Sequence, residues 1–199
     1  MNEKPILYCG PMVRAILDGS KTQTRRIVKF NASHRVELRG KQWHILDPNA
    51  VLGCPKGTKQ CRLWVKETHK FNGTMVGPRC TYRADDEEIY YDWAPADSPA
   101  WLADDNHWRP SIFMPRWASR ITLEITAVKV ERLQSISEAD VWSEGAMQVS
   151  PSLWRESFPN DDDRLFRSRR CYQELWESIN GPGSWAKNPW VFVITFKKL

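Results

Sequence analysis

The sequence predicts an α+β fold, in which a few amphipathic helices pack against a β-sheet. Apolar and polar side chains alternate at residues 62–67 and 121–130, and residues 190–196 form a continuous apolar run. Helical spacing of apolar residues occurs near 11–18, 138–144 and 164–180. A chain of 199 residues is long enough to bury a substantial core. We therefore expect one domain spanning residues 1–199, with a single hydrophobic core.

The N-terminal segment predicts a short apolar run followed directly by a helix. The run Pro5 to Cys9 ends at Gly10-Pro11, and proline is favoured at the first position of a helix. Residues 11–18 then place their apolar side chains on one face: Met12, Val13, Ile16 and Leu17. Gly19 follows Asp18, which predicts a left-handed cap that ends the helix and turns the chain sharply.

The strand patterns predict both a buried carboxyl group and a bend. In residues 62–67, Glu67 alternates onto the same face as Leu63 and Val65. In residues 121–130 the apolar phase changes, which predicts a β-bulge near Ala127 of the kind that is frequent in small barrels. The run 190–196 is apolar on both faces, which is typical of a central strand.

Two helices are predicted in the C-terminal third of the chain. Ser137 begins SEAD, which resembles a capping box and predicts a helix near 138–144 that ends at Gly145. Residues 161–163 are aspartates that can cap a longer helix near 164–180. Its predicted buried stripe is Leu165, Tyr172, Leu175, Trp176 and Ile179.

Charge is distributed unevenly along the chain. Residues 85–109 hold eight acidic residues and one arginine, a net charge of −7, while the whole chain carries +5. The remainder therefore carries +12, and a strongly basic body is typical of proteins that bind phosphate groups in nucleic acids or nucleotides. Three prolines interrupt the acidic stretch, so we expect an irregular acidic insertion at about 85–110.

Cysteine and histidine patterns favour neither disulfides nor metal. The five cysteines form no CxxC pair and the four histidines lack the HExxH spacing, so we expect a reduced protein with no metal and no cofactor. The sequence contains no apolar run long enough for a membrane span and no signal-peptide pattern. We expect a cytoplasmic protein without membrane contact, and the sequence predicts no protein partner.

The stretch GSKTQTRR, residues 19–26, carries the residues most suited to chemistry. Arg25 and Arg26 lie close to Lys21 and lower its pKa, more so if Lys21 is buried, and a neutral lysine can act as a base. Such a base could activate the Thr24 hydroxyl as a nucleophile, and a poorly solvated Glu67 could protonate a leaving amine. The alternative is that Glu67 only pairs with Lys21 or Arg26 at the mouth of a barrel.

A second candidate region combines aromatic and cationic residues suited to stacking on a base and holding a phosphate. Together with Arg25 and Arg26, its predicted nucleotide-binding or nucleic-acid-binding residues are Trp108, Arg109, Ser111, Arg116, Trp117 and Arg120. The alternative is that the tryptophans belong to the core and the arginines are exposed surface charges.

The chain resembles the ASCH domain family, a group of small PUA-like β-barrel proteins. Residues 19–26 match the GxKxxTxR signature of that family. Further blocks resemble ASCH proteins encoded by bacteriophages and prophages: PILYCGPMVRAILDG, CRLWVKET, TYRAD, WRPSIFMPRWASRITLEITAVKVERLQSIS, ELWESINGPGSW and NPWVFVITF. The resemblance implies a PUA-like mixed β-barrel with flanking helices.

Some ASCH relatives are amidohydrolases that remove the acetyl group from N4-acetylcytidine with a threonine, a lysine and a glutamate. The resemblance implies those roles for Thr24, Lys21 and Glu67, without a metal, and a modified nucleoside or RNA or DNA as partner. Other relatives bind RNA or act as ribonucleases, so a non-catalytic module that binds RNA or modified DNA and a ribonuclease remain alternatives. The chain departs from the family in its acidic insertion and at Phe113, where a histidine is usual.

Overall fold

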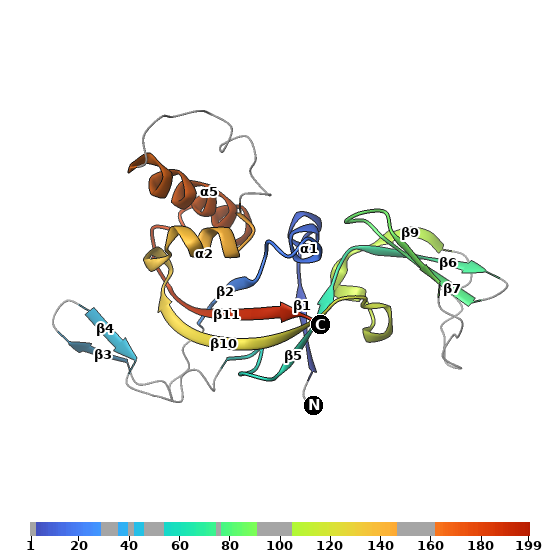
Figure 1. The fold of residues 1–199 in the computed structure, drawn as a ribbon, viewed down its shortest axis with the longest axis horizontal. Helices are drawn as coiled ribbons and strands as arrows, with labels where there is room; N and C mark the ends of the chain where they lie inside the picture. The colour runs from blue at the N-terminus through green and yellow to red at the C-terminus, as the bar shows by residue number, and fades with distance from the viewer. Residues whose placement is uncertain are drawn as a thin grey trace.

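A computed structural model describes residues 3–28, 36–39, 42–45, 54–74, 77–90, 105–146 and 162–199. Figure 1 shows a long curved sheet at the centre, helices above it, and a second sheet that extends to one side. The fold class is therefore α+β, as the sequence predicts. None of the helices in these ranges is both long and apolar enough to cross a membrane.

The central sheet has five strands in the order β1-β5-β10-β11-β2. Their bounds are β1 Glu3–Leu7, β5 Arg62–Lys66, β10 Thr122–Arg132, β11 Trp190–Lys198 and β2 Gln23–Ile27. β1 and β5 are parallel and the other pairs are antiparallel, so the sheet is mixed. Among the described strands no pairing closes this sheet into a barrel, and β1 and β2 form its two edges.

Three strand predictions are confirmed. β11 lies between β10 and β2, so the apolar C-terminal run is an interior strand. The register between β10 and β11 shifts between Ile125 and Ala127, where the bulge is expected. Leu63 and Val65 are fully buried and Glu67, directly after β5, is 1% exposed, so the carboxyl group does share the apolar face.

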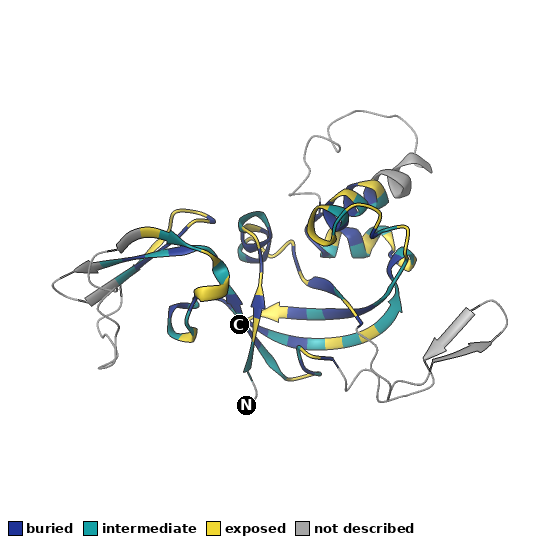
Figure 2. Ribbon diagram, turned by 180° about the vertical axis from the view of Figure 1, so that it is seen from behind, coloured by how far each residue is buried: buried dark blue, intermediate teal, exposed yellow. Residues whose placement is uncertain are grey.

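Within the described ranges, three α-helices lie on one face of the central sheet (Figure 1). They are α1 Gly10–Leu17, α2 Glu138–Ser143 and α5 Asp162–Asn180, close to the predicted ranges. Their buried side chains join those of the sheet in one core, to which α1 contributes Met12, Val13 and Ile16, and α5 contributes Tyr172, Leu175 and Trp176. Figure 2 shows this burial on the helix faces that meet the sheet. Of the predicted stripe, Ile179 is not buried, because it lies in the last turn of α5 and is 60% exposed, and the Leu165 side chain lies outside the described part of the structure.

The ends of α1 and α2 follow their sequence signals. Gly19 adopts φ +83°, the left-handed conformation predicted after α1. At the start of α2, Ser137 accepts a hydrogen bond from the Asp140 N–H, and the Asp140 carboxylate accepts one from the Ser137 N–H. This reciprocal pair is the predicted capping box.

The second sheet has the strand order β8-β7-β6-β9. Its strands are β6 His69–Thr74, β7 Gly77–Tyr82, β8 Glu88–Tyr90 and β9 Asp105–Arg109, all paired antiparallel. The segment at 85–110 is thus not irregular throughout, because it supplies β8 and β9; residues 91–104 lie outside the described residues. A two-stranded hairpin, β3 Val36–Arg39 and β4 Gln42–Ile45, completes the described strands.

The second sheet has its own small cluster of buried side chains, so the expectation of a single core is wrong. The cluster is Phe71, Cys80, Tyr82, Met114 and Ala118. Met114 and Ala118 come from the segment between β9 and β10, which contains the short 3₁₀ helices η2 Ser111–Phe113 and η3 Arg116–Ala118. A third 3₁₀ helix, η4 Leu133–Ser135, connects β10 to α2. The junction between the two sheets therefore runs through residues 67–69 and 110–121.

Candidate functional site

A cavity of about 650 Å³ lies where β2, α1, α2 and α5 meet. Its lining combines two buried cations, a carboxylate, hydroxyl groups and aromatic rings. The residues are Leu7, Tyr8, Cys9, Met12, Lys21, Thr24, Arg25, Arg26, Ile27, Thr68, Ser111, Glu144, Tyr172, Leu175, Trp176, Ile179 and Asn180. This volume and this mixture of apolar walls with a few polar groups are typical of small-molecule sites.

Lys21 is buried beside the cavity and bonds to Glu144. Its side chain is 2% exposed, and its Nζ donates to the Glu144 carboxylate at 3.1 Å. It also donates to the backbone carbonyls of Gln23 at 2.8 Å and Glu144 at 2.7 Å. Burial lowers the pKa of Lys21, and the Glu144 carboxylate opposes this shift. Lys21 and Glu144 are thus a desolvated acid–base pair in direct contact.

Two glycines allow this pair to form. The turn at Gly19 brings the Lys21 N–H back onto the Ala15 carbonyl of α1 at 2.8 Å, so the loop is fastened to the helix it has just left. Gly145 follows Glu144 with φ +69°, and a Cβ there would lie 3.0 Å from the Ala15 Cβ and 3.2 Å from the Lys21 Cβ. The end of α2 can approach Lys21 this closely because position 145 has no side chain.

Arg25 holds the other side of Glu144. Its Nη1 donates to the Glu144 carboxylate at 2.9 Å, and its Nη2 lies 2.7 Å from Glu131 and 3.1 Å from Asp140. The Arg25 side chain is fully buried, so three carboxylates already share its charge. Arg25 was predicted to bind nucleic acid, but its guanidinium instead fixes the position of Glu144.

Thr24 and Tyr8 bring hydroxyl groups to the same cavity. Thr24 is 4% exposed and lies on the edge strand β2, where it pairs with Ile194 of β11. The Tyr8 hydroxyl is buried, and none of the described residues lies in hydrogen-bonding geometry with it. Burial raises the pKa of Tyr8, which the nearby Arg26 and Thr24 oppose. An unpaired buried hydroxyl at a cavity wall is a natural contact for a polar group of a ligand.

Arg26 lies at the edge of the cavity, above the Tyr8 ring. Its guanidinium carbon lies 5.6 Å from the ring centre, and its Nη2 donates to the Leu7 carbonyl at 3.0 Å. No carboxylate among the described residues forms an ion pair with it. Of the predicted phosphate-binding arginines, Arg26 is therefore the one that lines the cavity without an acidic partner in the described chain.

The wall opposite β2 is aromatic and comes from α5. Tyr172 and Trp176 are buried, with ring centres 6.3 Å apart, and both line the cavity. Burial raises the pKa of Tyr172 well above its usual value, so its hydroxyl stays protonated. The Trp176 indole N–H is buried without a hydrogen-bond acceptor in the described part of the protein. These rings offer flat apolar surface to a base, together with an unused donor.

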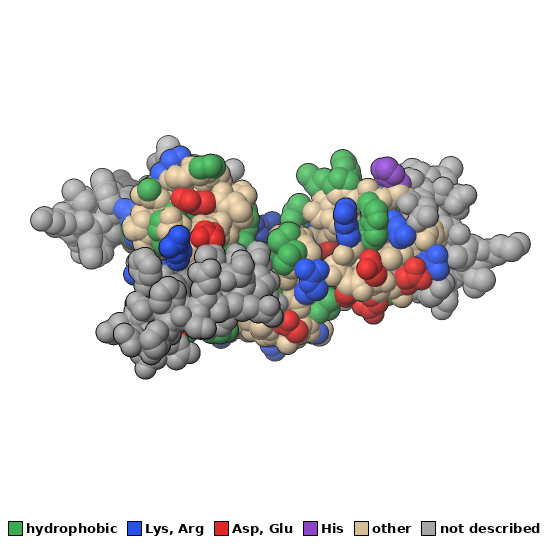
Figure 3. Space-filling model, turned by 90° about the horizontal axis from the view of Figure 1, so that it is seen from above, with side chains coloured by type: hydrophobic (Ala, Val, Ile, Leu, Met, Phe, Trp, Pro, Cys, Tyr) green, Lys and Arg blue, Asp and Glu red, His purple; other side chains and the backbone are tan. Residues whose placement is uncertain are grey.

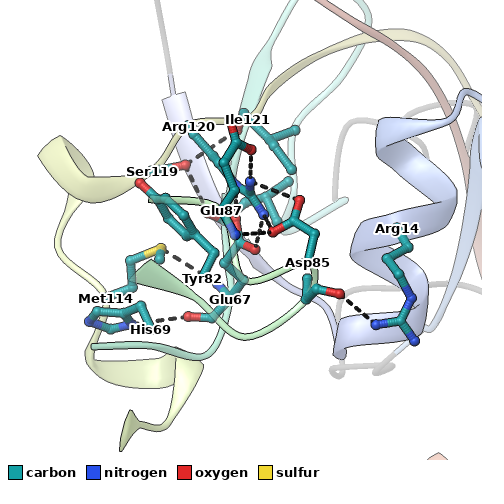
Figure 4. A network of polar contacts seen from close by, with 12 residues as sticks. Arg14, Glu67, His69, Tyr82, Asp85, Glu87, Met114, Ser119, Arg120 and Ile121 are labelled. Carbon is teal, nitrogen blue, oxygen red and sulfur yellow. Dashed lines mark hydrogen bonds and ion pairs between the residues drawn. The ribbon is translucent and has the colours of Figure 1, made fainter. Parts of the chain in front are cut away.

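Glu67 does not join this group. It lines a smaller neighbouring pocket of about 240 Å³ with Arg14, Arg83 and Ala84. Arg120 binds its carboxylate in a two-point fork, with Nε and Nη2 donating at 3.0 and 2.9 Å (Figure 4). Burial raises the pKa of Glu67, and Arg120 opposes the shift. The expected trio is thus divided: Lys21 and Thr24 line the large cavity, and Glu67 lies in an ion-pair cluster at the junction of the sheets.

Arg120 is committed to that cluster rather than available to a ligand. Besides Glu67 it pairs with Asp85 and Glu87, and its guanidinium lies 4.0 Å from the centre of the Tyr82 ring. Figure 4 shows the three carboxylates converging on the one guanidinium. These acids bring the start of the acidic stretch against the end of β5. Glu67 is therefore an ion-pair residue, but its partner is Arg120 and not Lys21 or Arg26, the partners that the alternative named.

The other predicted binding residues lie apart from one another. Ser111 lines the large cavity, whereas Trp117 stacks on Phe71 at 5.1 Å and packs against the small core. Arg116 pairs with Glu3 of β1 at 2.8 Å. Trp108 and Arg109 end β9; Arg109 is opposite His69 in the register, which places Trp108 on the other face of that sheet.

Glu144 is the cavity residue that sequence reasoning missed. A usable signal was present: a carboxylate at the C-terminal end of a helix opposes the helix dipole and therefore needs a cationic partner. The partner, Lys21, lies 123 residues away, which local patterns do not reveal. Across the described ranges, no group of three or more His, Cys, Asp or Glu is placed to hold a metal ion, and the five cysteines are all free.

Lys21 and Glu144 are close enough to exchange a proton, and the Thr24 hydroxyl group belongs to the lining of the same cavity. Comparison of the chain with models of known families, with curated proteins and with solved structures finds no match.

Proposed function

We propose that this protein is an amidohydrolase that removes the acyl group from N4-acylated cytidine or a related modified nucleoside. The observation that carries the proposal is the contact of the buried Lys21 amine with the Glu144 carboxylate at 3.1 Å, in a cavity that Thr24 also lines. The resemblance of residues 19–26 to the ASCH signature supports the same chemistry. Glu144 takes the role of the acid that the sequence assigned to Glu67.

The first half of the reaction uses the Lys21–Glu144 pair as a proton reservoir. A proton passes from the Lys21 ammonium to Glu144, which leaves a neutral amine and a carboxylic acid. The amine takes the proton of the Thr24 hydroxyl as its oxygen attacks the acyl carbon. When the tetrahedral intermediate collapses, Glu144 protonates the departing cytosine nitrogen, and the acyl group remains as an ester on Thr24.

The second half releases the acyl group with water. Glu144, now a carboxylate, accepts a proton from the attacking water, and the Lys21 ammonium returns one to the Thr24 oxygen as the ester bond breaks. Transfer of a proton within the pair then restores the starting state. Desolvation of Lys21 favours this cycle, because it brings the proton affinities of the amine and the carboxylate closer together.

The substrate fits the remaining walls of the cavity. The Tyr172 and Trp176 rings suit a pyrimidine, and the unpaired Tyr8 hydroxyl and Trp176 N–H suit its polar edge. Arg26 at the cavity edge suits a phosphate or a sugar hydroxyl. We also propose that the fold is related to the PUA-like β-barrels and that the partner of this protein is a modified nucleoside.

The test is to incubate the protein with N4-acetylcytidine and to measure cytidine by chromatography. Thr24→Val and Lys21→Met should lower the rate by a factor on the order of 10² to 10⁴, the range of positioned acid–base groups, while Thr24→Ser should keep part of it. Glu67→Gln is the matched control and should leave the rate within a few-fold of wild type. Hydrolysis that survives in both Thr24→Val and Lys21→Met contradicts the mechanism.

A non-catalytic binding module is the second candidate, and one observation favours it. All three Nζ donors of Lys21 are already bonded, two of them to backbone carbonyls, as expected of a structural ammonium group. This candidate predicts no product from any acylated nucleoside and salt-sensitive RNA binding. Shortening of the RNA in the same experiment would instead indicate a ribonuclease.

A further inference from the structure

The second sheet presents an indole ring between two cations on its open face. The Lys70 Nζ lies 5.1 Å from the centre of the Trp108 ring, and the Arg83 guanidinium carbon lies 5.6 Å from it. Lys70 and Trp108 lie on the face opposite to the buried Phe71, since His69 pairs with Arg109. Arg83 is exposed, and Lys70 and Trp108 are half-buried.

This arrangement combines what single-stranded nucleic acid requires. An aromatic ring stacks on any base, and flanking cations attract the phosphates on either side of that base. Among the described residues, neither Lys70 nor Arg83 is in an ion pair with a carboxylate. Figure 3 shows Lys and Arg side chains beside hydrophobic ones on this part of the surface, with acidic side chains gathered along one side of it.

The surface is continuous with the proposed active site. Thr68 lines both the large cavity and the small pocket, and Arg83 lines the small pocket as well. The Arg83 N–H donates to the Thr68 carbonyl at 3.0 Å, so the two residues are directly joined. Lys70 follows two residues after Thr68 on β6, about 7 Å along a strand. A nucleotide next to one bound in the cavity thus has the Trp108 ring within reach.

A second indole between two cations shows why the location matters. Trp64 on β5 lies 5.3 Å from Lys66 and 5.9 Å from Arg116. Its cations are already engaged, because Arg116 pairs with Glu3 and Lys66 donates to the Ile112 carbonyl. Trp64 also does not line the large cavity. It has similar chemistry without the connection to the site, which makes it a matched control.

We propose that Lys70, Trp108 and Arg83 bind a neighbouring nucleotide of a single-stranded nucleic acid, so that the substrate is a modified base within a strand rather than a free nucleoside. This inference rests on the proposed function for the identity of the base in the cavity. The surface itself requires only that a single strand bind, which can be measured without any reaction.

The binding experiment uses fluorescence anisotropy with a short labelled single-stranded RNA of mixed sequence. Trp108→Ala should weaken binding by about 5- to 150-fold, the range for loss of one base–aromatic stack. Trp108→Phe should recover most of the affinity, and Trp64→Ala should leave it nearly unchanged. Lys70→Ala and Arg83→Ala should each reduce the slope of log K against log salt by about one. An equal loss in Trp64→Ala and Trp108→Ala, or none in Trp108→Ala, overturns the proposal.

The reaction experiment separates this inference from the proposed function. It compares kcat/KM for N4-acetylcytidine alone and for the same base within the RNA. Trp108→Ala should lower kcat/KM for the RNA by the factor seen in binding and should leave the free nucleoside unaffected. Hydrolysis of both substrates with no effect of Trp108→Ala on either overturns the strand proposal alone. Binding that depends on Trp108 without any hydrolysis overturns the amidohydrolase alone.

Discussion

Substitution of Glu144 by glutamine tests the central feature of the site, the buried pair with Lys21. Glutamine keeps the volume of the side chain but removes its charge. Its amide NH₂ group also points toward either Lys21 or Arg25, neither of which can accept a hydrogen bond. Glu144 is 4% exposed and lies 3.1 Å from Lys21 and 2.9 Å from Arg25. Loss of one partner from a buried pair costs about 3 to 5 kcal/mol.

The structure places Glu144→Gln near the lower end of that range. Arg25 keeps Glu131 and Asp140, so the uncompensated charge falls mainly on Lys21. We therefore expect a loss of about 3 kcal/mol in the free energy of unfolding at neutral pH. For a chain of this length, that loss lowers Tm by roughly 6 to 12 °C.

The pH dependence gives this prediction its sign. Burial lowers the pKa of Lys21 in the folded chain, and without Glu144 nothing of comparable charge opposes the shift. The unfolded chain then binds the Lys21 proton more tightly than the folded one, so stability rises with pH between the folded and unfolded pKa of Lys21. The loss of unfolding free energy in Glu144→Gln should therefore become smaller as the pH rises toward the usual pKa of lysine.

Urea unfolding followed by tryptophan fluorescence measures both effects. Glu131→Gln is the matched control: it also removes a carboxylate from Arg25, but it is more exposed and makes no contact with Lys21, so it should cost about 1 kcal/mol. The prediction fails if the free energy of unfolding of Glu144→Gln lies within about 1 kcal/mol of that of wild type and depends on pH in the same way. Lys21 would then not be held by a buried charge pair.

Three further substitutions probe other parts of the site. Arg120→Met leaves the Glu67 carboxylate buried without its partner, so urea unfolding at neutral pH should show a loss of about 3 to 5 kcal/mol in the free energy of unfolding. Because burial raises the pKa of Glu67, the stability of the variant falls as the pH rises through that pKa, and the loss should be smaller in acid. A loss that does not depend on pH would contradict this account. Gly145→Ala adds a Cβ at φ +69° against Ala15 and Lys21, so thermal melts should show a loss of about 1 to 3 kcal/mol, and an unchanged Tm would mean that the end of α2 is free to move. Tyr8→Phe removes a buried hydroxyl that has no partner among the described residues, so stability should stay within about 1 kcal/mol of wild type while isothermal titration shows weaker nucleoside binding; unchanged binding would remove Tyr8 from the site.

The sequence predicts the local features of this fold well, because each depends on neighbouring residues. Gly19 requires only its own freedom at positive φ to end α1, and the capping box at Ser137 closes over three residues. The bulge before Ala127 follows from a change of phase within one strand. The apolar C-terminal run indicates an interior strand whatever its neighbours are.

What the sequence does not predict depends on distant contacts. Glu67 and Glu144 are both nearly fully buried carboxylates, and no local pattern shows that Arg120 binds one and Lys21 the other. The cations beside Arg25 in the sequence predict a ligand-binding residue, whereas the acids that surround it come from β10 and from α2 and its C-terminal end. The prolines of the acidic stretch predict an irregular segment, yet its first part, β8, pairs with β7 and its last part, β9, pairs with β6.

The position of β11 also determines when the cavity can exist. β2, which carries Thr24 and Arg25, hydrogen-bonds to the rest of the sheet through β11, whose residues 190–198 come much later in the chain. During synthesis β2 therefore stays unpaired on this side until residues 190–198 have left the ribosome. A chain truncated before Trp190 would contain the polar residues that line the cavity but would lack the strand that orders them, so the truncated chain should be inactive.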